Sequence, residues 1–395
     1  MRWAAAIAAL TCIDALAPRM AISGWTTYAN TSLDCHPSAP DTRCISAALY
    51  ETMADELVQE RYVDAGYRWI DINDGWAATT RDASGRLVAD ATRFPRGLAG
   101  VVASIQSKGL DVAVGLELGP TTCKHMAGSE GHYQLDVQTL GAANVTRLRV
   151  HACSIASASS SFYFRLSTLH AIAKRHVPPL ELDCVLDQFP VNASLVTPYC
   201  ATLTTQPTLP DNWAALQTRL RALLALPPAD MIAYHPGGLV VGGYALTEGQ
   251  NRLQLSVWLL LHAPLVVDME PWALSNTTRA LLQQPLVTQL TLEATMPSLP
   301  ELLGSLANGI QIWRRAIVLH GKAMTLLLAL RLDVQEPQYT VPLVFELSDV
   351  VGKACDRAIL HHVYGESPSV SIKYRFTLEI APLNAYLVLL EPTTR

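Results

Sequence analysis

The amino-acid sequence predicts an α/β protein: a (β/α)₈ TIM barrel followed by a C-terminal antiparallel β-sandwich. Three observations lead to this prediction. The chain has 395 residues, 50% hydrophobic and 16% charged, so it can bury a large core. Strand-like apolar runs alternate with helical patterns up to about Leu292, which is typical of parallel sheets. Beyond Leu292, short apolar runs separated by turns predict a sandwich of about 100 residues.

The barrel strands are expected where apolar runs end at polar or glycine residues. The candidates are residues 67–74, 110–118, 146–153, 180–186, 231–235 and 264–269. A helix is expected before the first of them, because Leu49, Met53, Leu57 and Val58 are spaced to lie on one helical face. In such a barrel, chemistry takes place at the C-terminal ends of the strands.

The N-terminus predicts a signal peptide over residues 1–17, followed by a barrel over 18–292 and a sandwich over 293–395. Arg2 precedes an alanine-rich apolar run, as in secretion signals; the alternative is a buried N-terminal strand. Eight cysteines without a CxxC pair argue against zinc. Four sequons, at Asn30, Asn144, Asn192 and Asn276, agree with a glycoprotein that is secreted or lysosomal.

Charge and motif content exclude several classes of function. The net charge of −5, with no basic run, excludes nucleic acid as an expected partner. No later apolar run reaches the ~20 residues of a membrane span. Residues 253–267 come closest, but Gln254, Ser256 and His262 interrupt them. There is no nucleotide-binding glycine motif, and we expect neither cofactor nor metal.

Several segments resemble one family closely. They are Met-Ala-Asp-Glu-Leu-Val at 53–58, Asp-Ala-Gly-Tyr-Arg-Trp-Ile at 64–70, Arg-Asp-Ala-Ser-Gly-Arg-Leu-Val-Ala-Asp at 81–90, Arg-Phe-Pro-Arg-Gly at 93–97, Gly-Ser-Glu-Gly-His-Tyr at 128–133 and Pro-Gly-Gly at 236–238. They resemble the melibiases of glycoside hydrolase family twenty-seven, in the branch of animal lysosomal α-galactosidase A and α-N-acetylgalactosaminidase. The resemblance covers residues 24–284. It implies a barrel with a C-terminal sandwich, retaining hydrolysis of terminal α-galactosides, and a homodimer.

The resemblance also implies a set of disulfides. Family bridges are matched by Cys35–Cys44, Cys123–Cys153 and Cys184–Cys200. A further family bridge has lost both cysteines, at Thr31 and Gly75, so that no orphan thiol remains there. Cys355 is expected to be unpaired.

Both catalytic positions of the family are substituted here. A retaining glycosidase needs two carboxylates about 5 Å apart. The nucleophile motif reads Arg149-Val-His151-Ala-Cys153, which places His151 at the nucleophile position, and the acid/base position is Thr208. Imidazole does not stabilise a cationic transition state as a carboxylate does, and a hydroxyl titrates too high to be a general acid. We expect His151 to be a barrel histidine hydrogen-bonded to its neighbours.

The sugar pocket of the family is also depleted. Its paired aspartates correspond to Asn73 and Asp74, and the resemblance implies substrate binding by these two and Arg149. Asp74 could equally cap the end of its strand. Gly115 stands where the family has a tyrosine, and Val185 where it has a glutamate.

These residues predict a catalytically inactive, degenerate family member. Two alternatives are retained. One is an active glycosidase with relocated carboxylates, drawn from Glu117, Asp183 and Asp187. The other is a pseudoenzyme that binds a glycan, such as an α-galactoside, or a protein in the old cleft.

Overall fold

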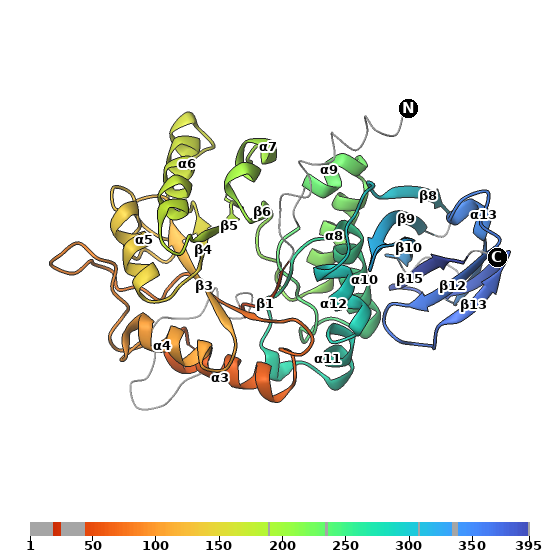
Figure 1. The fold of residues 1–395 in the computed structure, drawn as a ribbon, viewed down its shortest axis with the longest axis horizontal. Helices are drawn as coiled ribbons and strands as arrows, with labels where there is room; N and C mark the ends of the chain where they lie inside the picture. The colour runs from red at the N-terminus through yellow and green to blue at the C-terminus, as the bar shows by residue number, and fades with distance from the viewer. Residues whose placement is uncertain are drawn as a thin grey trace.

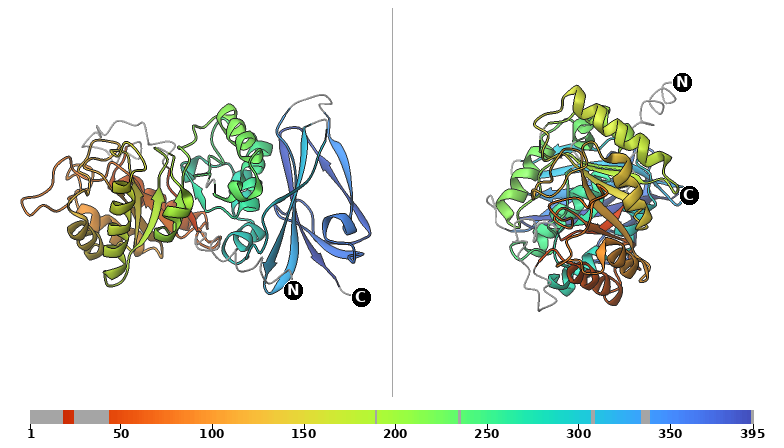
Figure 2. Two further views of the ribbon diagram at one scale, coloured as in Figure 1. Left: turned by 90° about the horizontal axis from the view of Figure 1, so that it is seen from above. Right: turned by 90° about the vertical axis from the view of Figure 1, so that its left-hand side faces the viewer.

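The computed structural model describes residues 19–24, 44–188, 190–233, 236–306, 309–333 and 339–393. Two regions follow one another along its long axis. A curled sheet surrounded by helices lies at one end, and an antiparallel β domain, blue in Figure 1, lies at the other. Seen from above in Figure 2, a group of helices separates the curled sheet from the β domain.

The curled sheet is entirely parallel. Its strands are β1 (Met20–Ile22), β2 (Trp69–Ile72), β3 (Asp111–Glu117), β4 (Arg147–His151), β5 (Glu181–Val185), β6 (Thr202–Thr204) and β7 (Leu265–Val267). They are ordered β6-β5-β4-β3-β2-β1-β7. Leu239 adds a single parallel bridge to Val267, on the side where an eighth strand would pair. The predicted TIM-like architecture is confirmed, with seven strands in the described part of the chain.

Three elements of the sheet differ from the sequence prediction, and one of them is β1, which was not among the predicted strands. Residues 231–233 do not begin a strand, because they end the helix α9 (Pro228–Ala233). Pro228 at its start and Asp230 in its first turn favour helix initiation, and these local signals outweigh the apolar run. Conversely, β6 was not predicted, since a polar three-residue strand has too little periodicity to stand out.

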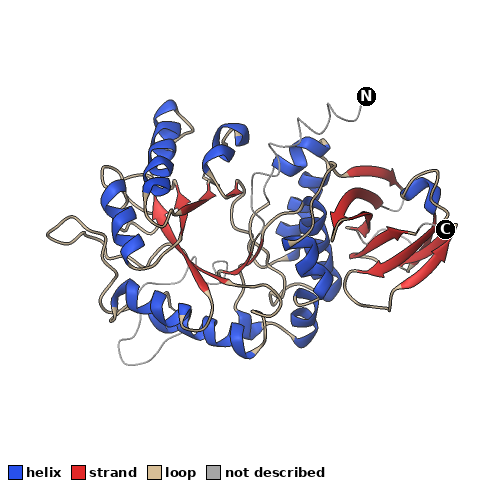
Figure 3. Ribbon diagram, viewed as in Figure 1, coloured by secondary structure: helices blue, strands red, loops and turns tan. Residues whose placement is uncertain are grey.

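Helices cover the outside of the sheet, as Figure 3 shows. They are α3 (Ala47–Gln59), α4 (Gly97–Gln106), α5 (Tyr133–Ala142), α6 (Ser160–Arg175), α7 (Ala193–Val196), α8 (Trp213–Leu224), α10 (Glu248–Leu261), α11 (Asn276–Leu282) and α12 (Pro285–Leu292), with 3₁₀ turns η1 (Thr197–Tyr199) and η2 (Pro271–Ala273). In α3, Leu49, Met53 and Leu57 are buried as predicted. Val58 is 45% exposed, so its assignment to the buried face was wrong.

The C-terminal domain is antiparallel throughout. Its strands are β8 (Glu301–Ser305), β9 (Ile310–Leu319), β10 (Lys322–Arg331), β11 (Val341–Glu346), β12 (Arg357–His362), β13 (Val370–Lys373), β14 (Arg375–Ile380) and β15 (Asn384–Pro392), with the short helix α13 (Leu347–Val350). β13 and β14 are joined by one residue pair, Lys373 and Arg375. The two halves of the sheet, joined at this pair, face each other, and Leu327 of β10 and Phe376 of β14 share one hydrophobic core. The predicted sandwich is confirmed.

Helix α10 joins the two regions. Its residues Leu253 to Leu261 are all buried, because one side packs against the barrel and the other against β10 and β15. The Ser256 and Tyr364 hydroxyls hydrogen-bond at 2.6 Å in this interface. No helix within the described ranges is long and apolar enough to cross a membrane.

The disulfides agree with the predicted pairing where they can be seen. Cys123 bonds to Cys153 and Cys184 to Cys200, and Cys355 is free. Cys44 is disulfide-bonded; its predicted partner Cys35, like the predicted signal peptide and Asn30, lies outside the described residues.

Candidate functional site

A cavity of about 620 Å³ opens at the C-terminal ends of the parallel strands. Parallel strands end at one edge of the sheet, so polar residues that follow them in sequence converge there. The five residues singled out from the sequence, Asn73, Asp74, Arg149, His151 and Thr208, all line this cavity. The cavity therefore brings together residues from β2, β4 and the loop after β6.

Asn73 and Asp74 follow β2, and both are already engaged by protein groups. The Asn73 amide donates to Ser23 Oγ at 2.8 Å, and its Oδ1 accepts from Arg149 Nε at 2.8 Å. The Asp74 carboxylate accepts from the backbone of Gly75 and Lys124 at 2.6 and 2.7 Å. Asp74 thus caps the strand end, and Asn73 retains little capacity to bind a ligand through its side chain.

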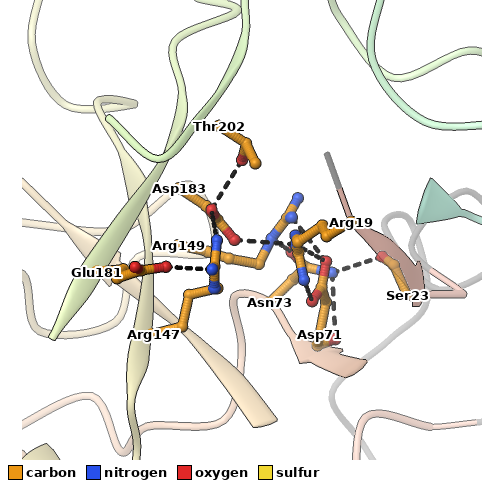
Figure 4. A network of polar contacts seen from close by, with 9 residues as sticks. All are labelled: Arg19, Ser23, Asp71, Asn73, Arg147, Arg149, Glu181, Asp183 and Thr202. Atoms are coloured by element: carbon orange, nitrogen blue, oxygen red, sulfur yellow. Dashed lines mark hydrogen bonds and ion pairs between the residues drawn. The ribbon is translucent and has the colours of Figure 1, made fainter. Parts of the chain in front are cut away.

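Arg149 belongs to an ion-pair network inside the barrel, drawn in Figure 4. Its Nη1 contacts Asp71 Oδ2 at 2.6 Å. Arg19 pairs with the same carboxylate through both oxygens, at 2.8 and 2.7 Å, and reaches Asp183 at 3.1 Å. Arg147 pairs with Asp183 at 2.6 Å and also with Glu181. Sequence reasoning missed this network because its members lie on β1, β2, β4 and β5.

His151 ends β4 and is not held as expected. Its Nε2 is buried and has no hydrogen-bond partner among the described residues. Burial and the neighbouring Arg149 lower the pKa of His151 to about 3. The imidazole is therefore neutral and presents an unsatisfied nitrogen at the cavity wall.

Thr208 and Asp211 lie in the loop between β6 and α8, and Tyr244, from the loop between α9 and α10, lines the same cavity. Asp211 Oδ2 accepts from the Tyr244 backbone at 2.7 Å, while its Oδ1 is buried and has no hydrogen-bond partner within the described part of the chain. The Tyr244 ring is 78% exposed at the rim of the cavity.

Asp268 is a cavity residue that the sequence analysis did not single out. It directly follows β7, lines the cavity and is 7% exposed. Burial raises its pKa to about 6, against the opposing effects of a hydrogen bond from Ser23 and the charge of Arg149. Gly238 leaves the space that this carboxylate occupies, because a Cβ there would collide with Asp268 Oδ2. Its place at a strand end was the signal that could have identified it.

The three carboxylates considered as relocated catalysts lie in different surroundings. Asp183 is buried in the ion-pair network and does not line the cavity. Glu117 accepts from the backbone of Gly119 and Cys153, each at 3.0 Å, and burial raises its pKa to about 7. It borders a separate small cavity of about 20 Å³. Only Asp187 lines the main cavity, where burial raises its pKa.

One group of side chains in the described ranges has metal-ligand spacing: Glu117, Cys123 and Cys153. The two sulfurs are bonded to each other, so neither is a thiolate that could bind a metal.

The comparisons with known proteins agree on one family. The family model described as Alpha galactosidase A matches residues 17–291. Human alpha-galactosidase A is 30% identical over 262 residues, covering 64% of this chain and 61% of that protein, so the match spans less than two thirds of that relative. Alpha-N-acetylgalactosaminidase of Gallus gallus is 26% identical over 278 residues, covering 68% and 69%.

The fold comparison gives alpha-galactosidase I from Mortierella vinacea, with a TM-score of 0.75 at 16% identity, covering 96% of this chain and 99% of the other. A putative alpha-N-acetylgalactosaminidase from Bacillus halodurans has a TM-score of 0.70 at 16% identity, covering 96% and 98%. At this identity the likeness shows the shared fold.

Proposed function

Because the chain belongs to the alpha galactosidase A family, we propose that it is a catalytically inactive member whose cavity still binds carbohydrate. One observation carries this proposal. The two positions at which the resemblance places the family's carboxylates are His151 and Thr208, and both line the cavity at the barrel mouth.

The chemistry of these two groups opposes glycoside hydrolysis. His151 is neutral, since its pKa is about 3, and it offers no negative charge to an oxocarbenium-like transition state. Thr208 cannot protonate a leaving oxygen at working pH. Asn73, Asp74 and Arg149 are engaged by protein groups. A ligand would therefore be held mainly by the other residues that line the cavity, such as Asp187, Asp268 and Tyr244.

The test is hydrolysis of a chromogenic α-galactoside and α-N-acetylgalactosaminide by the purified protein between pH 4 and 7. We expect no turnover above that of a heat-denatured sample, since loss of a catalytic group commonly costs about 10³-fold or more. The variant His151→Asp with Thr208→Asp tests the pocket itself. We expect this double variant to show no turnover either, because Gly115 and Val185 replace further pocket residues of the family. Turnover by the unmodified chain would overturn the proposal.

A second candidate, an active glycosidase with relocated carboxylates, has one observation in its favour. Asp187 and Asp268 both line the cavity, and burial raises the pKa of each, which suits a general acid. If any hydrolysis is measured, Asp187→Asn and Asp268→Asn decide this question. A relocated mechanism requires that each single variant abolish the activity.

We also propose that the protein enters the secretory pathway, to be secreted or lysosomal, and forms a homodimer. The disulfides and the exposed sequon residues Asn144, Asn192 and Asn276 support the first part. Family membership alone supports the second. A loss of mass when the secreted protein is treated with a glycosidase tests for glycans and therefore for passage through the secretory pathway. Its molar mass by light scattering tests the homodimer.

A further inference from the structure

Asp268 lies next to the ion-pair network of the barrel and lines the cavity. Three guanidinium groups, of Arg19, Arg147 and Arg149, pair with three carboxylates, of Asp71, Glu181 and Asp183. Asp268 has no ion pair of its own among the described residues. The cations that act on it, Arg149 and Arg19, are both ion-paired with Asp71, and Arg19 also with Asp183. An ionised Asp268 is therefore a negative charge in the cavity wall that has no directly paired cation among the described residues.

The same cavity wall contains further polar atoms that lack partners. Asp211 Oδ1 and His151 Nε2 are buried and unpartnered among the described residues, and both residues line the cavity. Buried polar atoms of this kind cost free energy until something binds them. Carboxylate oxygens can only accept hydrogen bonds, so a matching ligand must donate several.

The cavity also offers apolar surface. Leu203, Leu209, Val266 and Met269 line it, and the exposed ring of Tyr244 stands at its rim. Such surfaces suit the C–H face of a sugar ring, and an aromatic face also attracts cations. A cavity of about 620 Å³ has room for a small saccharide.

We propose that this cavity binds an amino sugar with a free ammonium group, with Asp268 as the counter-ion of the ammonium. This rests on the proposed function and names its ligand class. The ammonium supplies a cation that can pair directly with Asp268, and the sugar hydroxyls supply donors for the other carboxylates that line the cavity, Asp187 and Asp211. A neutral sugar supplies hydroxyl donors but no positive charge. An N-acetylated sugar also lacks the charge, because its nitrogen is an amide.

The pH dependence follows from the ionisation of Asp268. The groups that act on Asp268 are Ser23, Arg149, Asp71 and Arg19, and its pKa is about 6. At pH 7 the carboxylate is ionised and attracts the ammonium, whereas at pH 5 it is mostly protonated. His151 stays neutral at both values. The preference for the amino sugar should therefore be strong at pH 7 and weak at pH 5.

The experiment is calorimetric titration of the purified protein with galactosamine, galactose, N-acetylgalactosamine and ethanolamine at pH 7 and pH 5. We expect galactosamine to bind at least tenfold more tightly than the other three at pH 7. Asp268→Asn should remove that advantage. Asp64→Asn, at an exposed position outside the cavity, is the matched control and should keep it.

Each outcome bears on one part of the proposal. Equal binding of galactose and galactosamine, or an advantage that survives Asp268→Asn in a folded variant, overturns the inference and leaves the proposed function standing. Ethanolamine binding as tightly as galactosamine overturns the assignment to a sugar. Binding of none of the sugars overturns both the inference and the carbohydrate-binding part of the proposed function. If Asp268→Asn does not fold, the pH dependence of the unmodified protein serves instead, and an advantage for galactosamine that is equal at pH 5 and pH 7 contradicts the role of Asp268.

Discussion

Asp268 is a residue that lowers the stability of the folded state at neutral pH and provides a charged group in the cavity wall. Burial raises its pKa from 3.8 to about 6, so the folded protein binds this proton more tightly than the unfolded chain does. The stability that results is present at low pH and is lost as the pH rises through this window. At pH 7 the buried charge is a net cost, which is the usual pattern for a group kept for binding.

Asp268→Asn should therefore stabilise the protein at pH 7 and have little effect at pH 4. The amide keeps the size of the side chain and can still accept the hydrogen bond from Ser23. We expect the Tm at pH 7 to rise by a few degrees, since a cooperative unit of this size gains about 1–2 °C per kcal/mol. Thermal melts at both pH values, with Asp64→Asn as the control, check this. A lower Tm at pH 7 would mean that the charge is compensated in the folded state.

At the scale of elements, the ion-pair network connects four strands of the barrel. Arg19 precedes β1 and touches Asp71 of β2 and Asp183 of β5. Burial tends to raise the pKa of Asp183, but Arg19 and Arg147 outweigh it and hold that pKa below its usual value. This contribution to stability is present at neutral pH and is lost as the pH falls through the lowered pKa.

Arg19→Met should destabilise the barrel strongly. It leaves Asp183 with one arginine and removes two hydrogen bonds from Asp71, and breaking a buried pair in this way costs about 3–5 kcal/mol. Arg61→Met is the control, because the Arg61–Asp64 pair is exposed and worth about 0–1 kcal/mol. Urea denaturation of both variants at pH 7 measures the difference. If both variants lose the same amount of unfolding free energy, the network does not hold the strands together.

At the scale of the whole molecule, α10 makes the barrel and the sandwich one cooperative unit. It is buried on both sides, and β15 packs along it. The Ser256–Tyr364 hydrogen bond and the pairing of Arg252 with Glu366 cross this interface.

We expect the two regions to unfold in a single calorimetric transition. Tyr364→Phe should lower the unfolding free energy of the whole molecule by about 1–3 kcal/mol, because the Ser256 hydroxyl is left buried without its partner. Tyr374→Phe, at an exposed position, is the control and should change little. Two separate transitions, with only one shifted by Tyr364→Phe, would contradict the coupling.

The amino-acid sequence by itself determined the type of most elements. Alternating apolar runs predicted β2 to β5 and β7, because the side-chain period of a strand is a local property. The same reasoning failed at residues 231–233, where helix-initiating residues decide, and at β6, which is short and polar. The positions that line the cavity were found through the resemblance to the family, and those at strand ends, such as Asn73 and His151, meet there because the barrel topology places strand ends together.

Only the tertiary structure decided what those positions experience. Asn73 looked like a ligand-binding residue, but Ser23 and Arg149 occupy its amide. His151 looked like a hydrogen-bonded histidine, but its Nε2 has no partner in the described structure. Asp268 was not singled out, although it lines the cavity and burial raises its pKa to about 6. Charge compensation and burial depend on neighbours at least 34 residues away in the chain for the network of Arg147, and no local pattern encodes them.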